Sequence, residues 1–429
     1  MKDMIFFVCY GGGHSAAVKP VIKRLKASGQ KVTVLALTTA RPSMMADNLP
    51  AVGVKELIPL VPGYSRCLRV GRILVKSQML HPAVEVEESC AYLGVGFHSL
   101  VKTNGLIEAK NKYLSAGRHS FLPISFFIEL FKRHRPSVVV ATNSPRYERA
   151  ALEAARELNI PSVCIVDLYA YYEIQWCATK NYARKICVLN EQVRERFEKA
   201  GVPSERLRIT GNPAFDRLAK IDRLKRRGIV RQAQGIDEAR SVIVWISQPE
   251  PNRHPFSGVV GDVNYPLIVE SYLFEVFGSD PNLQLVMRLH PSESRPPAVR
   301  GDRVRYSNSS EFLDDLLCSA DCVITASSTV GLEAALLGLP VIQCMDSIFS
   351  QDLPLAELGV ATAVNSYKEL EPAIRTILAT PAAHRKGPVF DGAAASKVES
   401  AIMELLEPRP VDRLPGALPS GDRVDAFSS

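Results

Sequence analysis

Short apolar runs alternate with helical patterns along most of the chain, and this alternation sets the fold class. The runs are four to seven residues long and rich in Val and Ile, which is typical of strands buried on both faces. Strands that alternate with helices predict parallel sheets covered by helices. The predicted strands are Ile5–Val8, Lys31–Leu37, Ser137–Ala141, Ser162–Val166, Lys185–Leu189, Ser241–Ile246, Leu283–Arg288, Asp321–Ile324, 341–345 and Ala361–Val364.

The chain length of 429 residues exceeds one ordinary hydrophobic core and predicts two domains. A strongly charged stretch at 216–240 interrupts the strand pattern, which favours a boundary there. We therefore expect two Rossmann-like, doubly wound α/β domains that face a central cleft. The predicted segments are a first domain at 1–215, a charged linker at 216–240, a second domain at 241–392, a C-terminal helix at 393–407 and a disordered Pro/Gly-rich tail at 408–429.

Composition excludes several classes of protein. The nine cysteines form no CxxC pair and no cluster with zinc spacing, which predicts reduced thiols of a cytoplasmic protein without a structural metal. No run of 18 apolar residues exists, so no membrane span is expected. The net charge of +7 suits an anionic partner, but the sequence lacks the stripe of basic and aromatic residues typical of nucleic-acid binding.

A hydroxyl-rich turn follows the predicted strand at 321–324. Ser327, Ser328 and Thr329 lie at the start of a predicted helix, where unpaired backbone N–H groups and the helix dipole favour an anion such as phosphate. Glu333 lies one turn inside this helix, and its carboxylate can accept hydrogen bonds from a ribose diol. The alternative is ordinary capping of the helix, with Glu333 in solvent.

A glycine loop with a histidine follows the first predicted strand. Gly12 and Gly13 permit close approach of the backbone to a ligand, and His14 is suited to act as a general base. The pattern is not GxGxxG, and no acidic residue ends the second strand, which disfavours a dinucleotide site. The alternative is a tight turn in which His14 only caps the helix. Asp167 follows another strand at the same predicted edge.

Polar residues also follow two strands of the second domain. Ser247 and Gln248 come after one strand, and Arg288 and His290 after the next, so all four are candidate phosphate or nucleotide contacts; the alternative for His290 is that it caps the turn. No Asp-Xaa-Asp motif occurs, which favours a metal-free phosphate site at the helix N-terminus.

The segment 66–79 places Arg66, Arg69, Arg72 and Lys76 at steps of three and four residues. Such a basic amphipathic helix can rest on the inner face of an anionic membrane or bind a phosphorylated acceptor. The alternative is a solvated charged face.

Several motifs resemble known families. GGGHSAAVKPVIKRL is similar to the glycine loop and helix of GT-B glycosyltransferases, and RITGNPAFDRL resembles their interdomain stretch and that of UDP-N-acetylglucosamine 2-epimerases. SSTVGLEAALLGLPVI resembles the donor-nucleotide motif of this superfamily, with Glu333 at the ribose position. RLHP and SST are similar to motifs of bacterial sialyltransferases and glycerophosphotransferases, which use cytidine nucleotides. The resemblance implies a GT-B fold and places Gln351 and Asp352 near the donor sugar hydroxyls.

This resemblance implies a metal-independent glycosyltransferase without a cofactor, in which a UDP- or CMP-sugar gives its sugar to a glycan, glycolipid or protein acceptor during bacterial surface polysaccharide assembly. His14 and Asp167 are the predicted catalytic residues, and His14 as base favours an inverting reaction. Epimerases are expected to carry acidic residues on the turns TNSPR and VDLYA, where only Asp167 is acidic, so transfer is favoured. The alternatives are a UDP-N-acetylglucosamine 2-epimerase or nucleotide-sugar hydrolase, and a catalytically silent nucleotide-sugar-binding protein.

Overall fold

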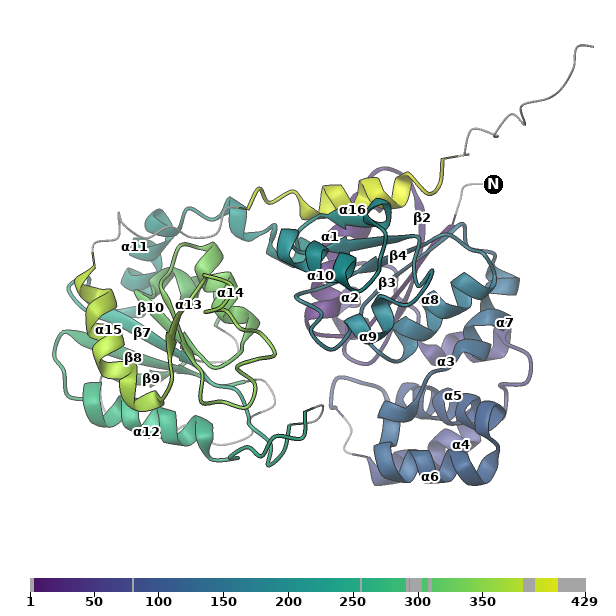
Figure 1. Cartoon of the computed structure of the whole chain (residues 1–429), viewed down its shortest axis with the longest axis horizontal. Coiled ribbons are helices and arrows are strands. Elements are labelled where there is room, and N and C mark those ends of the chain that lie inside the picture. The colour runs from purple at the N-terminus through teal and green to yellow at the C-terminus, as the bar shows by residue number, and fades with distance from the viewer. Residues whose placement is uncertain are drawn as a thin grey trace, which may run out of the picture.

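The computed structural model describes residues 4–78, 81–254, 257–290, 293, 303–307, 311–380 and 390–407. It contains two parallel six-stranded sheets with helices on their faces (Figure 1), which confirms the predicted α/β class. We call the sheet β1–β6 with its helices the first lobe, and the sheet β7–β12 with its helices the second lobe. The predicted tail at 408–429 and the last residue of the basic segment 66–79 lie outside the described residues.

The first sheet has the strand order β2-β1-β3-β4-β5-β6. Its inner strands are buried because helices cover both faces, as the continuous apolar runs predict. The strands are β1 Met4–Cys9, β2 Lys31–Ala36, β3 Val138–Thr142, β4 Ser162–Ile165, β5 Lys185–Val188 and β6 Leu207–Ile209. Its helices are α1 Gly13–Ala27, α2 Ala40–Ala46, α7 Ile124–His134, α8 Tyr147–Glu157, α9 Ile174–Cys177 and α10 Glu191–Lys199.

The second sheet has the order β12-β11-β10-β7-β8-β9. Its strands are β7 Ser241–Ile246, β8 Leu283–Arg288, β9 Val304–Tyr306, β10 Cys322–Thr325, β11 Val341–Cys344 and β12 Thr362–Val364. Its helices are α11 Arg223–Gln234, α12 Tyr265–Phe277, α13 Leu313–Ser319, α14 Thr329–Leu336 and α15 Leu370–Ala379. Short 3-10 turns occur at η1 Ile58–Leu60, η2 Val75–Ser77, η3 Gly117–Ser120, η4 Ser204–Arg206, η5 Pro213–Phe215, η6 Leu218–Lys220 and η7 Tyr367–Glu369.

A layer of helices extends the first lobe below its sheet (Figure 1). It consists of α3 Val54–Leu57, α4 Cys67–Leu74, α5 Val86–Asn104 and α6 Leu106–Ala116. The backbones of α4 and α5 touch, because a Cβ on Gly71 would lie 1.8 Å from the carbonyl oxygen of Cys90. The sequence shows no clear pattern for α5, since a helix buried on most of its sides lacks an amphipathic period.

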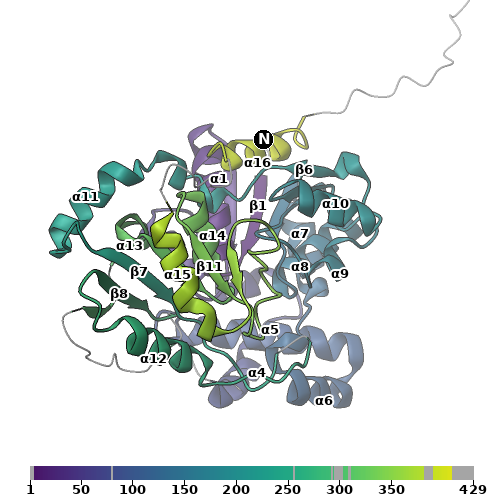
Figure 2. The ribbon, with the colours of Figure 1, turned by 60° about the vertical axis from the view of Figure 1, so that its left-hand side comes forward.

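The chain returns to the first lobe at its end. Helix α16, Ala394–Met403, lies beside α1 (Figure 2), and Val398 and Ile402 share a core cluster with Phe7. Both carboxylate oxygens of Asp216 accept hydrogen bonds at the start of this helix, from the backbone N–H groups of residues 394 and 395 at 2.9 and 2.8 Å. The segment that leaves the first lobe thus caps the helix that returns to it.

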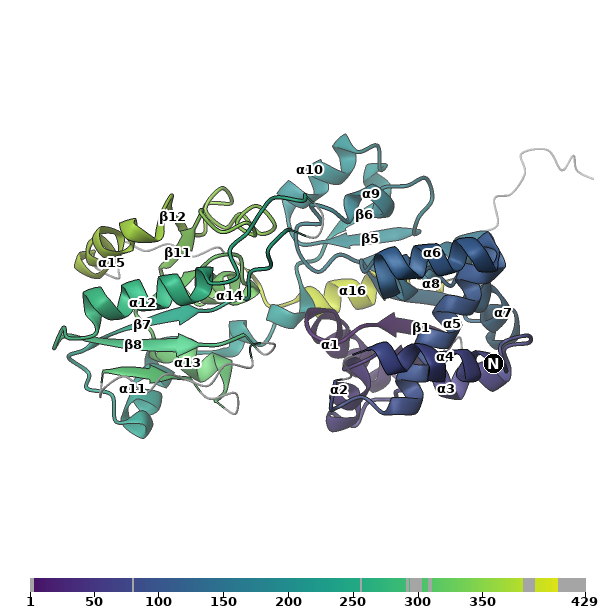
Figure 3. The same cartoon turned by 90° about the horizontal axis from the view of Figure 1, so that it is seen from below.

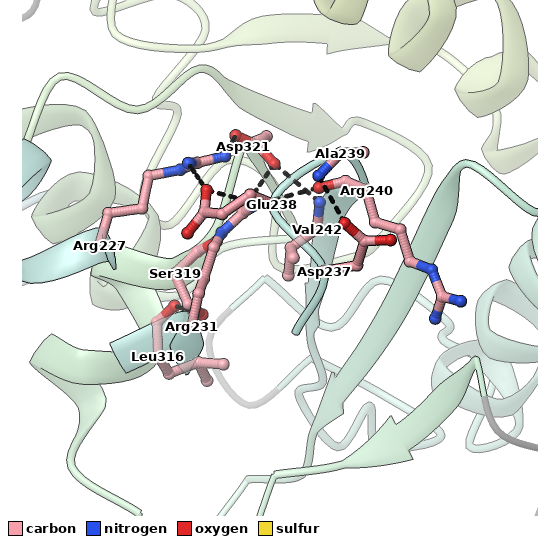
Figure 4. Close-up of polar contacts among 10 residues, drawn as sticks. All are labelled: Arg227, Arg231, Asp237, Glu238, Ala239, Arg240, Val242, Leu316, Ser319 and Asp321. Atoms are coloured by element: carbon pink, nitrogen blue, oxygen red, sulfur yellow. Dashed lines mark hydrogen bonds and ion pairs between the residues drawn. The ribbon is translucent and has the colours of Figure 1, made fainter. Parts of the chain in front are cut away.

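The segment predicted as a charged linker contains α11, which is anchored to the second lobe through Arg231 (Figure 4). This side chain is fully buried, and its guanidinium donates to the carbonyl of Ser319 at 3.0 and 2.8 Å, to the carbonyl of Arg240 at 2.9 Å and to Asp321 at 2.5 Å. A buried cation is stable only when such acceptors surround it. Helix α11 is therefore held rigidly against the second lobe.

Candidate functional site

The strand order places a topological switch point in each sheet. The chain leaves β1 toward β2 and returns on the other side of β1 as β3; in the second sheet it leaves β7 toward β8 and returns as β10. Open parallel sheets bind ligands at the carboxyl ends of the strands beside such points. The glycine loop and the hydroxyl-rich turn follow β1 and β10, and the helices after them, α1 and α14, lie on the facing sides of the two lobes (Figures 1 and 3).

His14 lies in the first turn of α1 and faces several carboxylates. Its Nδ1 is 2.6 Å from the Thr142 hydroxyl, 3.8 Å from the Asp167 carboxylate and 3.9 Å from the Glu148 carboxylate. Glu173 also raises the pKa of His14 through its charge. The two predicted catalytic residues are thus brought together, and Glu148 and Glu173 join them.

Glu148 ties the ends of two strands together. Its carboxylate is fully buried and accepts hydrogen bonds from the backbone N–H of Tyr10 at 2.7 Å, from the backbone N–H of Ser144 at 3.0 Å and from the Thr142 hydroxyl. Tyr10 follows β1 and Ser144 follows β3. The charge of Glu148 therefore fixes the glycine loop relative to the turn after β3.

The electrostatics of this cluster favour a protonated imidazole. Burial alone would lower the pKa of His14, but the charges of Glu148, Asp167 and Glu173 outweigh burial and raise it above its ordinary value. Burial raises the pKa of Glu173, and the charge of Asp167 adds to that rise. Groups whose pKa values move toward neutrality are suited to proton transfer.

Reasoning from the two turns alone missed Glu148 and Glu173. Glu148 belongs to the first turn of α8, from which its side chain reaches back to the end of β3. Glu173 follows Asp167 by six residues and lies just before α9. An acidic residue at the start of the helix that follows each strand was the available signal.

The glycine loop leaves space beside Gly12 and Gly13. Gly12 has φ +64°, a conformation that side chains disfavour, and a Cβ on Gly13 would lie 3.9 Å from the Asp167 carboxylate. Helix α1 has no side-chain hydrogen bond at its N-cap, Gly12. A bulky residue at Gly13 would therefore project toward Asp167.

The hydroxyl-rich turn of the second lobe follows β10. The Ser328 hydroxyl accepts a hydrogen bond from the backbone N–H of Val330 at 3.2 Å, so Ser328 caps α14. Ser327 is half-buried and Thr329 is exposed. The capping alternative therefore holds for Ser328, while the other two hydroxyls lie at the same helix end.

Gln343 supports this turn from β11. Its buried amide nitrogen donates to the carbonyls of Ala326 and Leu353, both at 2.8 Å, and to that of Ser350 at 3.1 Å. Its amide oxygen accepts from the backbone N–H of Ala356 at 2.8 Å. A single polar side chain in an apolar strand thus holds the turn against the loop that follows β11.

Glu333 is not in solvent. It is almost buried and pairs with Arg217, whose guanidinium also donates to Asp314 at 2.9 Å. Burial raises the pKa of Glu333, and the charge of Arg217 opposes that rise. A ribose bound at Glu333 would share the carboxylate with Arg217.

Two of the other predicted contacts meet at Glu293. The Ser247 hydroxyl donates to this carboxylate at 3.0 Å, and the backbone N–H of His290 donates to it at 2.7 Å. Burial lowers the pKa of His290. The amide oxygen of Gln248 is buried and, among the described residues, has no hydrogen-bond partner.

Arg288 reaches in a different direction. Its guanidinium donates to the Ser307 hydroxyl at 2.7 Å and to the carbonyl of Glu311 at 3.2 Å, on the side of β9. Strands β8 and β9 lie on one side of β7 and β10 lies on the other. These contacts therefore place the guanidinium on the opposite side of β7 from the turn at Ser327–Thr329.

Asp352 lies at a contact between the lobes, whereas Gln351 is exposed. The carboxylate accepts from the Tyr172 hydroxyl of the first lobe at 3.1 Å and lies 3.0 Å from Nε2 of the buried His254. Tyr172 directly precedes Glu173. This contact therefore links the loop after β11 to the carboxylate cluster.

A cavity of about 200 Å³ lies between the lobes. Its walls are largely apolar and include Leu189, Asn190, Phe215, Leu332, Leu336 and Val360, and Tyr169 also lines it. No group of three or more His, Cys, Asp or Glu side chains has a metal-binding arrangement in the part of the chain that the structure describes. All nine cysteines are buried and free.

Comparisons with solved structures agree on the fold. The UDP-N-acetylglucosamine 2-epimerase from Neisseria meningitidis bound to UDP-N-acetylglucosamine is 16% identical, with a TM-score of 0.57 over 94% of this chain and 100% of that one. A putative enzyme of the same kind from Listeria monocytogenes is 13% identical, with a TM-score of 0.59 over 95% and 97%. The glycotransferase of kitacinnamycin is 13% identical, with a TM-score of 0.52 over 95% of each chain.

Sequence comparison gives the family. A search of curated proteins gave no significant match. The family model described as UDP-N-acetylglucosamine 2-epimerase matches residues 166–403, which is more than half of the chain. The match covers Asp167, Glu173 and the whole second sheet. This chain belongs to the UDP-N-acetylglucosamine 2-epimerase family.

Proposed function

We propose that this protein binds a UDP-sugar and inverts the configuration at C2 of its N-acetylated sugar. The observation that carries the proposal is the position of His14 among Glu148, Asp167 and Glu173 at the switch point of the first sheet. Family membership and the likeness to a structure bound to UDP-N-acetylglucosamine support it. Epimerisation is therefore the first candidate, in place of the glycosyl transfer that the sequence favoured.

Inversion at C2 requires that a base remove the C2 proton from one face while the C1–O bond to UDP breaks, so that the electron pair forms a C1–C2 double bond. UDP then adds back to C1, and an acid delivers a proton to the opposite face of C2. Two groups of different protonation state meet this need best. His14, whose pKa is raised, can carry the acidic proton, and Asp167, 3.8 Å away, can accept one. Glu173 is a second candidate base, because its pKa is also raised. Glu148 is a positioning residue, because its carboxylate already accepts three hydrogen bonds.

The nucleotide has a proposed place in the second lobe. The phosphates would bind at the start of α14, where Ser327 and Thr329 accompany the helix dipole, and the ribose at Glu333. The unpaired amide oxygen of Gln248 lies on the neighbouring loop and can accept a hydrogen bond from a ligand. The proposed chemistry needs no metal and no cofactor.

Turnover without an acceptor tests this function. Protein and UDP-N-acetylglucosamine are incubated alone, and the 2-epimer is followed by proton NMR. We expect the epimer to form, and His14→Gln to abolish its formation while leaving the affinity for UDP unchanged by calorimetry. His119→Gln, at an exposed position, is the control. A protein that binds UDP but forms no product would be a silent binding protein and would contradict the proposal.

Glycosyl transfer is the second candidate. The likeness to a glycotransferase along 95% of both chains favours it. A transferase would release UDP only when an acceptor hydroxyl is present and would form no epimer. The same incubation, repeated with and without a glycan acceptor, therefore separates the two reactions.

A further inference from the structure

The lower face of the helical layer carries basic and apolar side chains together. Helices α4 and α6 both lie at the bottom of the first lobe in Figure 1 and toward the viewer in Figure 3. The two segments are joined, because the amide of Gln78, just after η2, donates to the Tyr113 hydroxyl of α6 at 3.4 Å. We define the outer helical face by six exposed residues on these helices and η2: Arg69, Arg72, Ile73, Lys76, Ile107 and Leu114.

Three branched apolar side chains of this face project into solvent. Ile73 is 66% exposed, Ile107 is 80% exposed and Leu114 is 83% exposed. Ile107 and Leu114 lie two turns apart on one side of α6, beside charged residues, which is typical of an interaction surface. We therefore expect a binding partner that buries the apolar side chains of this face.

The contact between α4 and α5 on the opposite side fixes which side chains of α4 point outward. Cβ atoms on Gly71 of α4 and Gly94 of α5 would lie 1.8 and 2.0 Å from carbonyl oxygens of the opposite helix. Cys67 and Gly71 are buried in this contact. Because the two backbones touch, α4 cannot rotate to bury its basic side.

The charge of the face selects the partner. Arg66, Arg69, Arg72 and Lys76 are all exposed, and α6 adds the exposed Lys110. A twofold pairing of this face with a second copy would bring these cations against one another, which costs free energy. Basic side chains interleaved with projecting Ile and Leu are instead typical of helices that lie in the plane of an anionic bilayer.

We propose that the outer helical face docks the protein onto an anionic membrane surface. The basic side chains contact lipid phosphates, and Ile73, Ile107 and Leu114 enter the acyl boundary. Within the described ranges, no helix has the length and apolarity needed to cross a bilayer, so the contact is peripheral. The proposal is independent of the reaction that the cleft performs.

Vesicle sedimentation tests the proposal with the full chain. We expect the protein to sediment with vesicles of phosphatidylcholine and phosphatidylglycerol, to remain in solution with phosphatidylcholine alone, and to be released by high salt. The double variant Arg69→Gln/Arg72→Gln should partition roughly thirtyfold less, since each basic residue near an anionic surface contributes a factor of about five. Ile107→Ser/Leu114→Ser should also lose binding.

Matched controls lie on the second lobe and on α10. Leu224→Ser on α11 removes an apolar side chain that is 73% exposed, and Lys199→Gln on α10 removes an exposed charge; both should bind as wild type does. Circular dichroism checks that each variant is folded. Absence of sedimentation, equal binding to neutral vesicles, or a dimer in light scattering that Ile107→Ser dissociates would each overturn the proposal.

Discussion

Replacing Glu148 by Gln should destabilise the first lobe by about 2–4 kcal/mol. The substitution keeps the shape but removes the charge from a fully buried group that accepts from the backbone N–H groups of Tyr10 and Ser144. A glutamine oxygen can replace only one carboxylate oxygen, and its NH₂ group then faces a donor. A lost charge-assisted bond costs about 1 kcal/mol, and a buried N–H without an acceptor costs about 1–3 kcal/mol.

Urea unfolding followed by circular dichroism measures this loss, with Glu157→Gln as the matched control. Glu157 lies in the last turn of the same helix and is exposed, so its replacement should cost about 0.5 kcal/mol or less. If Glu148→Gln is no more destabilising than Glu157→Gln, Glu148 does not hold the two strand ends together. The account of the cluster would then be wrong.

Three further predictions concern the histidine, the helical layer and the linker. The pKa of His14 is raised in the folded protein, so the imidazolium stabilises the fold fully below about pH 6.5, and this stabilisation is lost as the pH rises through the raised pKa. The difference in unfolding free energy between wild type and His14→Gln should therefore shrink over that pH range. A difference that stays constant with pH would contradict this prediction. Gly71→Ala should lower the free energy of unfolding by about 1–3 kcal/mol, because the added Cβ would meet a carbonyl oxygen of α5. Gly228→Ala, a helical position with open space around it, should raise that free energy by about 0.5–1 kcal/mol. Equal urea denaturation midpoints for the two variants would refute the close contact between α4 and α5. Arg231→Met should lower the free energy of unfolding by about 3–5 kcal/mol, because it leaves buried acceptors unpaired. The control Arg226→Met changes an exposed side chain and should cost about 1 kcal/mol or less. Similar losses for the two variants would show that Arg231 does not anchor α11.

The alternating pattern predicted the two parallel sheets because strands buried on both faces are continuous apolar runs. Strands β6 and β9 were missed, because each has three residues and an arginine in the middle, which leaves no apolar run to detect. Helix α5 was missed for the opposite reason, because its burial on most sides removes the amphipathic period. Local pattern thus identifies elements of ordinary length that have one clear environment.

The candidate site could be predicted only where its residues follow strands directly. His14 and Asp167 were found because both follow parallel strands at one edge of a sheet. Glu148 was missed because its role depends on the backbone of Tyr10, which lies 138 residues away in the chain. The pairing of Glu333 with Arg217 spans 116 residues and was not predictable for the same reason.

The most direct test of the central claim is solvent exchange at C2 of the sugar. Wild-type protein and UDP-N-acetylglucosamine are incubated in D₂O without an acceptor, and the C2 position is followed by proton NMR and mass spectrometry. If the carboxylates and the imidazole exchange a proton at C2, the 2-epimer will carry one deuterium at that position, and Asp167→Asn will form it far more slowly. Unlabelled sugar after prolonged incubation with a protein that binds UDP would contradict the account.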